Sequence, residues 1–111
     1  MASDCIFCKI VNKEIPSTFI YENETLVVFK DISPKAPVHL LVVPKKHIRS
    51  INDLTMDDKG IVTEMIYIAK RMAKDMSVDT TGYNLLFNVE KGGGQEVFHL
   101  HLHLTGGYEK G

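Results

Sequence analysis

Apolar and polar residues alternate most regularly near the C-terminus, in the run His99-Leu100-His101-Leu102-His103-Leu104. Successive side chains of a strand point to opposite faces, so the alternation predicts a strand over 97–105. The leucine face is expected to pack on a core, and the imidazole face to line a site. Three of the five histidines of the chain lie in this row, which makes it the first place to look for chemistry.

A different periodicity in the middle of the chain predicts one long helix. Its apolar stripe consists of Ile61, Met65, Ile68, Met72 and Met76. Residues at this spacing share one helix face, which we expect to pack on a sheet. Thr55, with Asp58 three residues later, resembles a capping box and marks the helix start. Methionine-rich faces also occur in binding grooves, but core packing is the preferred interpretation here.

Shorter patterns predict the remaining elements. They are a helix over 5–11, capped by Ser3 or Asp4, and strands over 19–22, 25–30, 38–43 and 83–89. A turn at Asn23-Glu24 joins the first two strands, and the glycine run 92–94 separates the last two. Strands joined mostly as hairpins, together with one long helix, argue for an α+β fold on a five-stranded antiparallel sheet.

Composition narrows the class of protein. With 111 residues the chain is long enough for one domain, which we expect to span 1–111. A formal net charge of -1 provides no polybasic surface, so nucleic acid is not the expected partner. No apolar run approaches the roughly 18 residues that cross a bilayer, so no membrane partner is expected either. Two cysteines are too few for a disulfide scaffold, which favours the cytoplasm.

Three arrangements are open for His99, His101 and His103. An exposed polar face would normally carry Lys, Glu and Thr rather than three imidazoles. Coordination of one metal by all three is opposed by geometry, because same-face neighbours on a strand lie about 6.6 Å apart and zinc–nitrogen bonds are about 2 Å long. A division of roles, with one histidine structural and another catalytic, fits strand geometry best.

Cys5 and Cys8 supply half of a tetrahedral zinc site, because a C-x-x-C turn places two sulfurs around one ion. A redox pair is less favoured, since a thioredoxin-type motif lies in a βαβ unit. Simple packing of the two thiols beneath a helix also stays open. The missing ligands would be histidines, namely His47 after the buried strand and His99 in the histidine row. Such a closed site would be structural.

His101 then remains free of the metal, and its neighbours suit phosphorus chemistry. Neutral imidazole is a good nucleophile near neutral pH. The run Gly92-Gly93-Gly94-Gln95 can present backbone N–H groups to an anion, although hairpin loops also use glycines. Asn88, Gln95 and His103 are candidate hydrogen-bond donors to phosphate or a leaving group. Neither a Walker lysine motif nor a carboxylate cluster for magnesium is present, so catalysis is expected to need no cofactor.

Two parts of the chain together resemble the histidine triad superfamily. The stretch Gly94–Leu104 is similar to its signature, His-φ-His-φ-His-φ-φ with φ apolar, and departs from it only at Thr105. The stretches Phe29–His39 and Pro44–Ile48 look like the Hint branch, the histidine triad nucleotide-binding proteins. The resemblance runs from Cys5 to Gly107. Fhit-like diadenosine polyphosphate hydrolases share the triad, but the Asp-Ile-Ser-Pro loop resembles Hint more.

The resemblance implies a purine nucleotide-binding hydrolase that cleaves nucleoside 5′-phosphoramidates and adenylylated substrates. It also implies a homodimer with the sheet extended across both copies. His101 would attack the α-phosphorus and form a nucleotidyl-histidine intermediate. His103 would contact the phosphate or leaving group, and His39 would sit behind the triad and help set its protonation.

The same resemblance implies the ligand contacts. Asp31 and Ile32 would meet the ribose and Asn88 the phosphate side. Apolar walls around the base would be Phe7, Ile10, Phe29 and Leu41, although Phe29 and Leu41 equally suit an ordinary core. The predicted nucleotide-binding set also includes Gly94, Gln95, Val97, His101 and His103. Relatives with a C-x-x-C pair and two histidines carry zinc, which implies zinc at Cys5, Cys8, His47 and His99. Glu96 replaces a serine of animal members and is not counted as catalytic.

Two other functions stay open. One is a nucleotide-binding regulatory or scaffold protein in which slow hydrolysis is incidental. The other is a Fhit-like dinucleoside polyphosphate hydrolase, which shares the triad but takes a different substrate.

Overall fold

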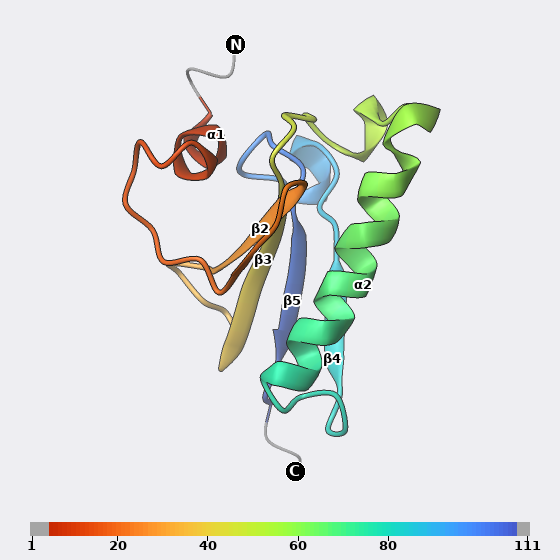
Figure 1. Ribbon diagram of the computed structural model, residues 1–111. Helices are drawn as coiled ribbons and strands as arrows, with labels where there is room; N and C mark the ends of the chain where they lie inside the picture. The colour runs from red at the N-terminus through yellow and green to blue at the C-terminus, as the bar shows by residue number, and fades with distance from the viewer. Residues whose placement is uncertain (1–4, 109–111) are drawn as a thin grey trace.

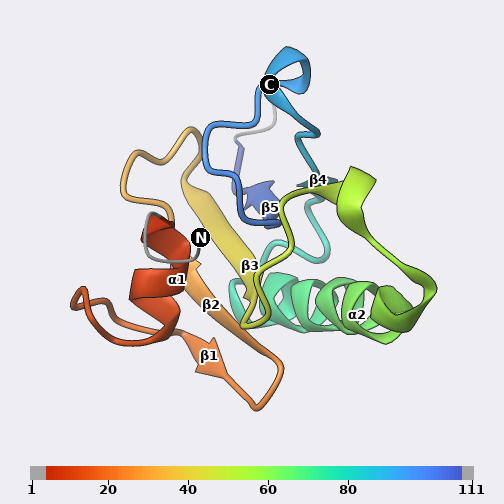
Figure 2. The same cartoon turned by 90° about the horizontal axis from the view of Figure 1, so that it is seen from above.

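The computed structural model describes residues 5–108. Five strands form one antiparallel sheet in the order β1-β2-β3-β5-β4. The strands are β1 (Tyr21–Glu22), β2 (Leu26–Lys30), β3 (Val38–Pro44), β4 (Tyr83–Leu86) and β5 (Leu102–Gly106). A short helix, α1 (Ile6–Val11), and a long helix, α2 (Lys59–Asp75), lie on opposite sides of the sheet (Figure 1, Figure 2). The predicted α+β fold is confirmed.

Strand alternation divides the core into two layers. On β2, β3 and β5, even-numbered side chains such as Leu40 and Leu102 pack in the layer that includes α2. Odd-numbered side chains of β2 and β3, such as Phe29 and Leu41, pack in the layer that includes α1. The leucines at 100, 102 and 104 are almost fully buried in the α2 layer, as the alternation predicted. By the same alternation, the odd-numbered histidines of β3 and β5 face the α1 side.

Helix α2 packs on the sheet through the predicted stripe. Met65 and Met72 are buried in the core, and the other three members of the stripe pack against it. The methionines therefore fill the core rather than line a groove. The Asp58 carboxylate accepts the backbone N–H of Thr55 at 3.0 Å, so the predicted capping pair is present. The capping pair begins a 3-10 turn, Met56–Asp58, and α2 follows this turn directly.

Several predicted boundaries differ from the structure. The last strand begins at Leu102 rather than at 97, because the N–H of Leu100 donates to the Ile48 carbonyl at 2.6 Å, outside the sheet. The strand predicted over 83–89 ends at Leu86, and that predicted over 19–22 covers only two residues. The cap predicted at Ser3 or Asp4 falls outside the described residues, and Cys5 occupies the N-cap position of α1.

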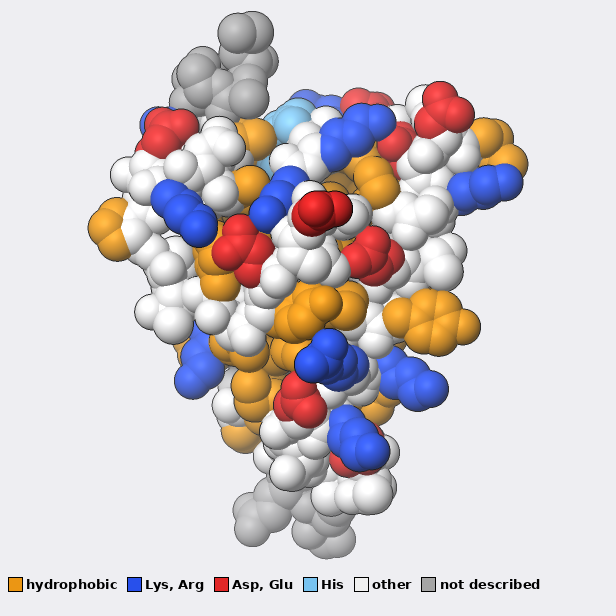
Figure 3. Space-filling view, viewed as in Figure 1, with side chains coloured by type: hydrophobic (Ala, Val, Ile, Leu, Met, Phe, Trp, Pro, Cys, Tyr) orange, Lys and Arg blue, Asp and Glu red, His pale blue; other side chains and the backbone are white. Residues whose placement is uncertain are grey.

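Charged side chains of both signs surround an apolar central area on the face drawn in Figure 3. No large area of one sign is visible on this face, in agreement with the nearly neutral net charge. Neither described helix is long and apolar enough to cross a bilayer.

Candidate active site and metal site

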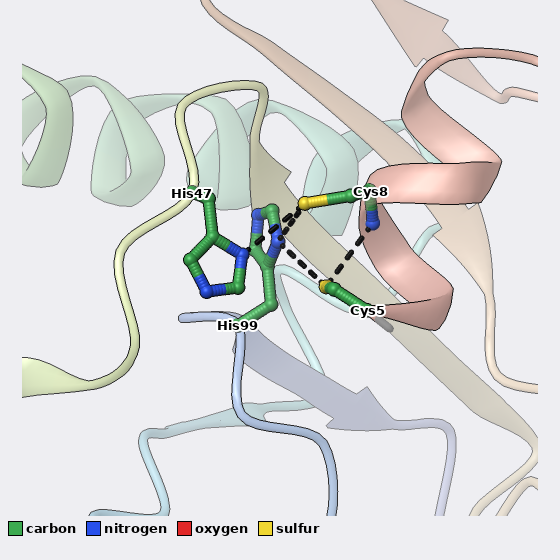
Figure 4. Close-up of side chains that lie close together, drawn as sticks. All are labelled: Cys5, Cys8, His47 and His99. Carbon is green, nitrogen blue, oxygen red and sulfur yellow. Dashed lines mark hydrogen bonds between the residues drawn. The ribbon is translucent and has the colours of Figure 1, made fainter. Parts of the chain in front are cut away.

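Four predicted metal ligands meet beside the start of α1 (Figure 4). Cys5 is the N-cap residue of α1 and Cys8 lies within that helix, whereas His47 comes from the loop after β3 and His99 from the segment before β5. Their ligand atoms all lie within 4.8 Å of one another. The Nδ1 atom of His99 is 3.3 Å from the sulfur of Cys5 and 3.4 Å from that of Cys8. The Nδ1 atom of His47 is 3.2 Å from the sulfur of Cys8.

This donor set fits zinc. In a tetrahedral site with bonds of about 2.3 Å to sulfur and about 2.0 Å to nitrogen, sulfur and nitrogen lie about 3.5 Å apart. The sulfur–nitrogen distances of the cluster are close to that value. The Nε2 atom of His99 is 2.7 Å from the Pro44 carbonyl oxygen. It therefore carries the ring proton and donates it, which leaves the Nδ1 lone pair directed at the sulfurs.

Burial sets the protonation of this cluster in the absence of a cation. Burial, followed by the neighbouring Cys5 side chain, raises the pKa of the Cys8 thiol to about 11. Burial also lowers the pKa of His99 to about 4, so the imidazole is neutral at pH 7. A buried thiol without a cation prefers its protonated form. A bound cation reverses this preference, because it stabilises the thiolate. The cluster thus has the chemistry of a metal site rather than that of a reactive thiol pair.

His101 lies directly before β5, on the sheet side of α1. Its Nδ1 atom is 2.7 Å from the His99 carbonyl oxygen, so Nδ1 carries the proton and Nε2 keeps a lone pair. Burial lowers the pKa of His101, which keeps the ring neutral at pH 7. The ring of Phe7 packs edge-on against it, with 5.0 Å between ring centroids. The result is a neutral imidazole whose Nε2 lone pair is hydrogen-bonded to no residue among 5–108.

A chain of hydrogen bonds fixes the opposite tautomer in His103. The backbone N–H of Lys35 donates to Nδ1 of His39 at 3.0 Å, so His39 carries its proton on Nε2. That nitrogen is 3.0 Å from Nδ1 of His103, which therefore accepts and leaves the His103 proton on Nε2. Burial, with the nearby His101 and His39, lowers the pKa of His103 to about 4. His103 is thus a neutral hydrogen-bond donor.

Asp31, His39 and His103 form a second group whose ligand-type atoms lie within 4.8 Å of one another. Proton placement opposes a metal there. The Nε2 atom of His39, which lies 3.5 Å from the Asp31 carboxylate, already carries the ring proton. The other ring nitrogen is held by the Lys35 N–H. The group is better described as a hydrogen-bond network behind the triad.

The predicted base walls lie in and around the α1 layer of the core. Phe7, Phe29 and Leu41 are buried there, and Ile10 and Val97 pack against its edge. Of the two residues predicted to meet the ribose, Ile32 is 95% exposed. Asp31 is half-buried and accepts the Ser33 N–H through one carboxylate oxygen at 2.8 Å. The buried members can form the floor of a base site, and only the edge residues are accessible from outside.

The glycine-rich loop between β4 and β5 brings Asn88 next to Gly94. A Cβ atom at Gly94 would lie 3.4 Å from the Asn88 side-chain nitrogen, and Gly94 has φ +88°, a conformation that favours glycine. The side chain of Gln95 is buried, and its NH₂ group donates to the carbonyls of Arg49 and Val97. Gln95 therefore braces the loop, and its amide is not free for the phosphate contact that the sequence suggested.

Known proteins match this arrangement over nearly the whole chain. The family model described as "Scavenger mRNA decapping enzyme C-term binding" matches residues 4–110. The purine nucleoside phosphoramidase of Escherichia coli K12 is 40% identical over 107 residues, covering 96% of this chain and 90% of that protein. The crystal structure of a HIT family hydrolase from Legionella pneumophila is 48% identical with a TM-score of 0.93, covering 96% of this chain and 95% of that one. The chain belongs to the histidine triad family.

Another relative bears on the metal cluster of this histidine triad protein. A zinc-bound histidine triad family protein from Mycobacterium smegmatis is 32% identical with a TM-score of 0.82, covering 96% of this chain and 76% of that one. The family and these relatives also identify the chain as a hydrolase. Zinc is bound by that relative, and for this chain zinc binding is a proposal.

The backbone groups that assign the protons of the triad were missed by sequence reasoning. They are the carbonyls of Pro44 and His99 and the N–H of Lys35. Main-chain groups leave no signal in a sequence, because every residue except proline has both. The contacts of Glu90 with the loop after β3 were also missed. An acidic residue two positions before a glycine run was the only available hint.

Proposed function

We propose that this histidine triad hydrolase is a nucleoside phosphoramidase of the Hint branch, which acts on nucleoside 5′-phosphoramidates and adenylylated substrates. The observation that carries the proposal is the tautomer of His101, whose bond to the His99 carbonyl directs the free lone pair to Nε2. Similarity to the purine nucleoside phosphoramidase of Escherichia coli supports a purine substrate.

In the proposed reaction, Nε2 of His101 attacks the α-phosphorus. The bond from phosphorus to the leaving amine breaks as the bond to His101 forms, and the amine departs with the electron pair and takes a proton from water. The hydrogen bond from Nδ1 to the His99 carbonyl stabilises the positive charge that the ring acquires. Water then cleaves the nucleotidyl-histidine, releases the nucleoside monophosphate and restores the neutral ring.

The other predicted residues have supporting roles in this proposal. His103 donates from Nε2 to the phosphate or leaving group, and His39 keeps it in that tautomer. Asp31 and Ile32 meet the ribose. Phe7, Ile10, Phe29, Leu41 and Val97 form the base site, and Asn88, Gly94 and Gln95 form or brace the phosphate side.

We further propose that Cys5, Cys8, His47 and His99 hold a structural zinc ion. Four protein ligands close a tetrahedral site, so no position is left for substrate or water. The proposed hydrolysis accordingly uses no cofactor. The ion would fasten α1 to the sheet and so hold Phe7 beside His101. A thiolate site is best kept in a reducing compartment, and we propose the cytoplasm.

A substrate comparison tests the proposed activity. Adenosine 5′-phosphoramidate and diadenosine triphosphate are assayed side by side with the purified protein, and the affinity for AMP is measured separately. We expect efficient cleavage of the phosphoramidate and little of the dinucleotide. The reverse preference would indicate a Fhit-like hydrolase. AMP binding with both rates near background would indicate a regulatory or scaffold protein.

We also propose a homodimer in which two copies of β4 pair edge to edge. Strand β4 is bonded to β5 on one side only, and Leu85 and Leu86 on it are 37% and 52% exposed. An unpaired apolar edge readily pairs with a second chain, and a lysine on such an edge prevents it.

Sedimentation at micromolar concentration is expected to give a dimer for the wild type and a monomer for Leu86→Lys. Glu24→Lys is the matched control, because it places a lysine in the turn between β1 and β2 at the opposite edge of the sheet. It should remain dimeric. A monomeric wild type, or a dimeric Leu86→Lys protein, would contradict the proposed interface.

A further inference from the structure

Glu90 has a backbone conformation that side-chain-bearing residues rarely adopt. Its φ is 60° and its ψ is 177°, a region populated almost only by glycine. Lys13 and Ser77 also have positive φ, but each directly follows the cap residue of a helix, where left-handed residues are common. Glu90 instead opens the glycine-rich loop. Such strain persists only where surrounding contacts enforce it.

Contacts to every polar group of Glu90 enforce this conformation. The Arg49 guanidinium donates to the carboxylate from Nη2 at 2.9 Å and from Nε at 3.2 Å. The Ser50 hydroxyl donates to the other carboxylate oxygen at 2.6 Å. The backbone N–H donates to the Gln95 side chain at 2.7 Å, and the backbone carbonyl accepts the N–H groups of Gly93 and Gln95. Arg49, followed by Ser50, holds the pKa of Glu90 below its usual value.

These contacts join the glycine-rich loop to the loop that follows β3. Arg49 and Ser50 come directly after Ile48, whose carbonyl accepts the N–H of Leu100, between two triad histidines. The Arg49 guanidinium also lies over the ring of Phe98, 4.3 Å from its centroid. One short segment, 48–50, therefore contacts both the glycine-rich loop and the backbone that carries His101.

The contacts inside the loop extend this connection to Asn88. The Asn88 side chain donates to the Gly93 carbonyl at 2.8 Å, while the N–H of Gly93 donates to the Glu90 carbonyl at 3.0 Å. Glycine at position 90 would adopt the observed backbone conformation at no steric cost. Only the carboxylate, through Arg49 and Ser50, gives a reason for glutamate there.

We propose that Glu90 is a positioning residue for the hydrolysis reaction. Its carboxylate, bound to Arg49 and Ser50, fixes the glycine-rich loop and Asn88 relative to His101. The inference rests on the proposed function, since the loop is taken to form the phosphate side of the site. Small displacements of binding groups cost large factors in rate, because the substrate is no longer aligned with the nucleophile.

The test compares Glu90→Gly, Glu90→Gln and Ser77→Gly with the wild type. Glu90→Gly relieves the strain and removes the carboxylate, so its unfolding midpoint should stay close to that of the wild type. Its kcat/KM for adenosine 5′-phosphoramidate should nevertheless fall at least about tenfold. Glu90→Gln can still accept from Ser50 and should recover part of the loss. Ser77→Gly likewise places glycine at a positive-φ position, but away from the site, and should keep the wild-type kcat/KM.

A second readout does not depend on hydrolysis. Hydrogen exchange of the Gly93 amide should be at least about tenfold faster in Glu90→Gly, because its acceptor is no longer held. Wild-type kcat/KM in Glu90→Gly would overturn the proposal, even if exchange became faster. If the wild-type protein cleaves no phosphoramidate, the proposed function fails. The inference is then tested by the affinity for AMP, which should weaken in Glu90→Gly and not in Ser77→Gly.

Discussion

Replacing His101 by asparagine is expected to slow hydrolysis of adenosine 5′-phosphoramidate by at least about a thousandfold. The asparagine amide can still donate to the His99 carbonyl, as Nδ1 of the imidazole does. It offers no nucleophile in place of Nε2. The substitution therefore removes the attacking lone pair and leaves the local backbone contact intact. Steady-state rates of purified protein measure the loss.

Two further measurements separate lost chemistry from lost binding. The affinity of His101→Asn for AMP should remain within about threefold of the wild type, since the base and ribose contacts are unchanged. His103→Asn is the matched control, because it removes a hydrogen-bond donor and keeps the nucleophile. Its rate should fall by about a hundredfold, the usual effect of losing one transition-state donor. Wild-type turnover by His101→Asn would show that another group attacks phosphorus.

Protein purified without chelator is expected to contain one zinc ion per chain, and removal of the ion should lower the free energy of unfolding by on the order of 5 kcal/mol. The ligands come from three separate segments, of which α1 is joined to the sheet through Cys5 and Cys8. Without the ion, two buried thiols, the buried imidazole of His99 and the exposed imidazole of His47 are left without a common partner. Elemental analysis and denaturant unfolding with and without chelator measure the two quantities.

A cysteine variant distinguishes zinc loss from side effects of the chelator. Cys8→Ala should contain no stoichiometric zinc and should unfold like the chelator-treated wild type. Chelator should then have no further effect on its unfolding. Wild-type protein that contains no zinc, and unfolds identically with and without chelator, would remove the basis for the metal site. A Cys8→Ala protein as stable as the zinc-loaded wild type would do the same.

Periodic side-chain patterns in the sequence predicted most of the fold. The leucines between the triad histidines are buried in the α2 layer, and the methionine stripe of α2 packs on the sheet. Both predictions depend only on the repeat of a strand or a helix, and a repeat is visible in the sequence. The clustering of Cys5, Cys8, His47 and His99 was also predicted, because thiol and imidazole types restrict the choice of partners.

The arrangement of the triad backbone could not be predicted in the same way. The alternation implied one strand through His99, His101 and His103, yet only His103 lies in β5. The Leu100 N–H bonds instead to the Ile48 carbonyl, some fifty positions earlier in the chain. A sequence pattern relates residues only a few positions apart, so it contains no information on a partner this far along the chain. Different environments for the three histidines were expected, but the backbone groups that set their tautomers were not.

The connection of α1 to the rest of the molecule has a consequence for the order of folding. A six-residue helix is too short to be stable alone in water. The partners of Cys8 in the cluster, His47 and His99, lie 39 and 91 positions further along the chain. Helix α1 can pack on β2 and β3 earlier, but its contacts with His99 are complete only after the segment before β5 is in place. Phe7 meets the ring of His101 in the same step, so the contacts between α1 and the triad form late in folding.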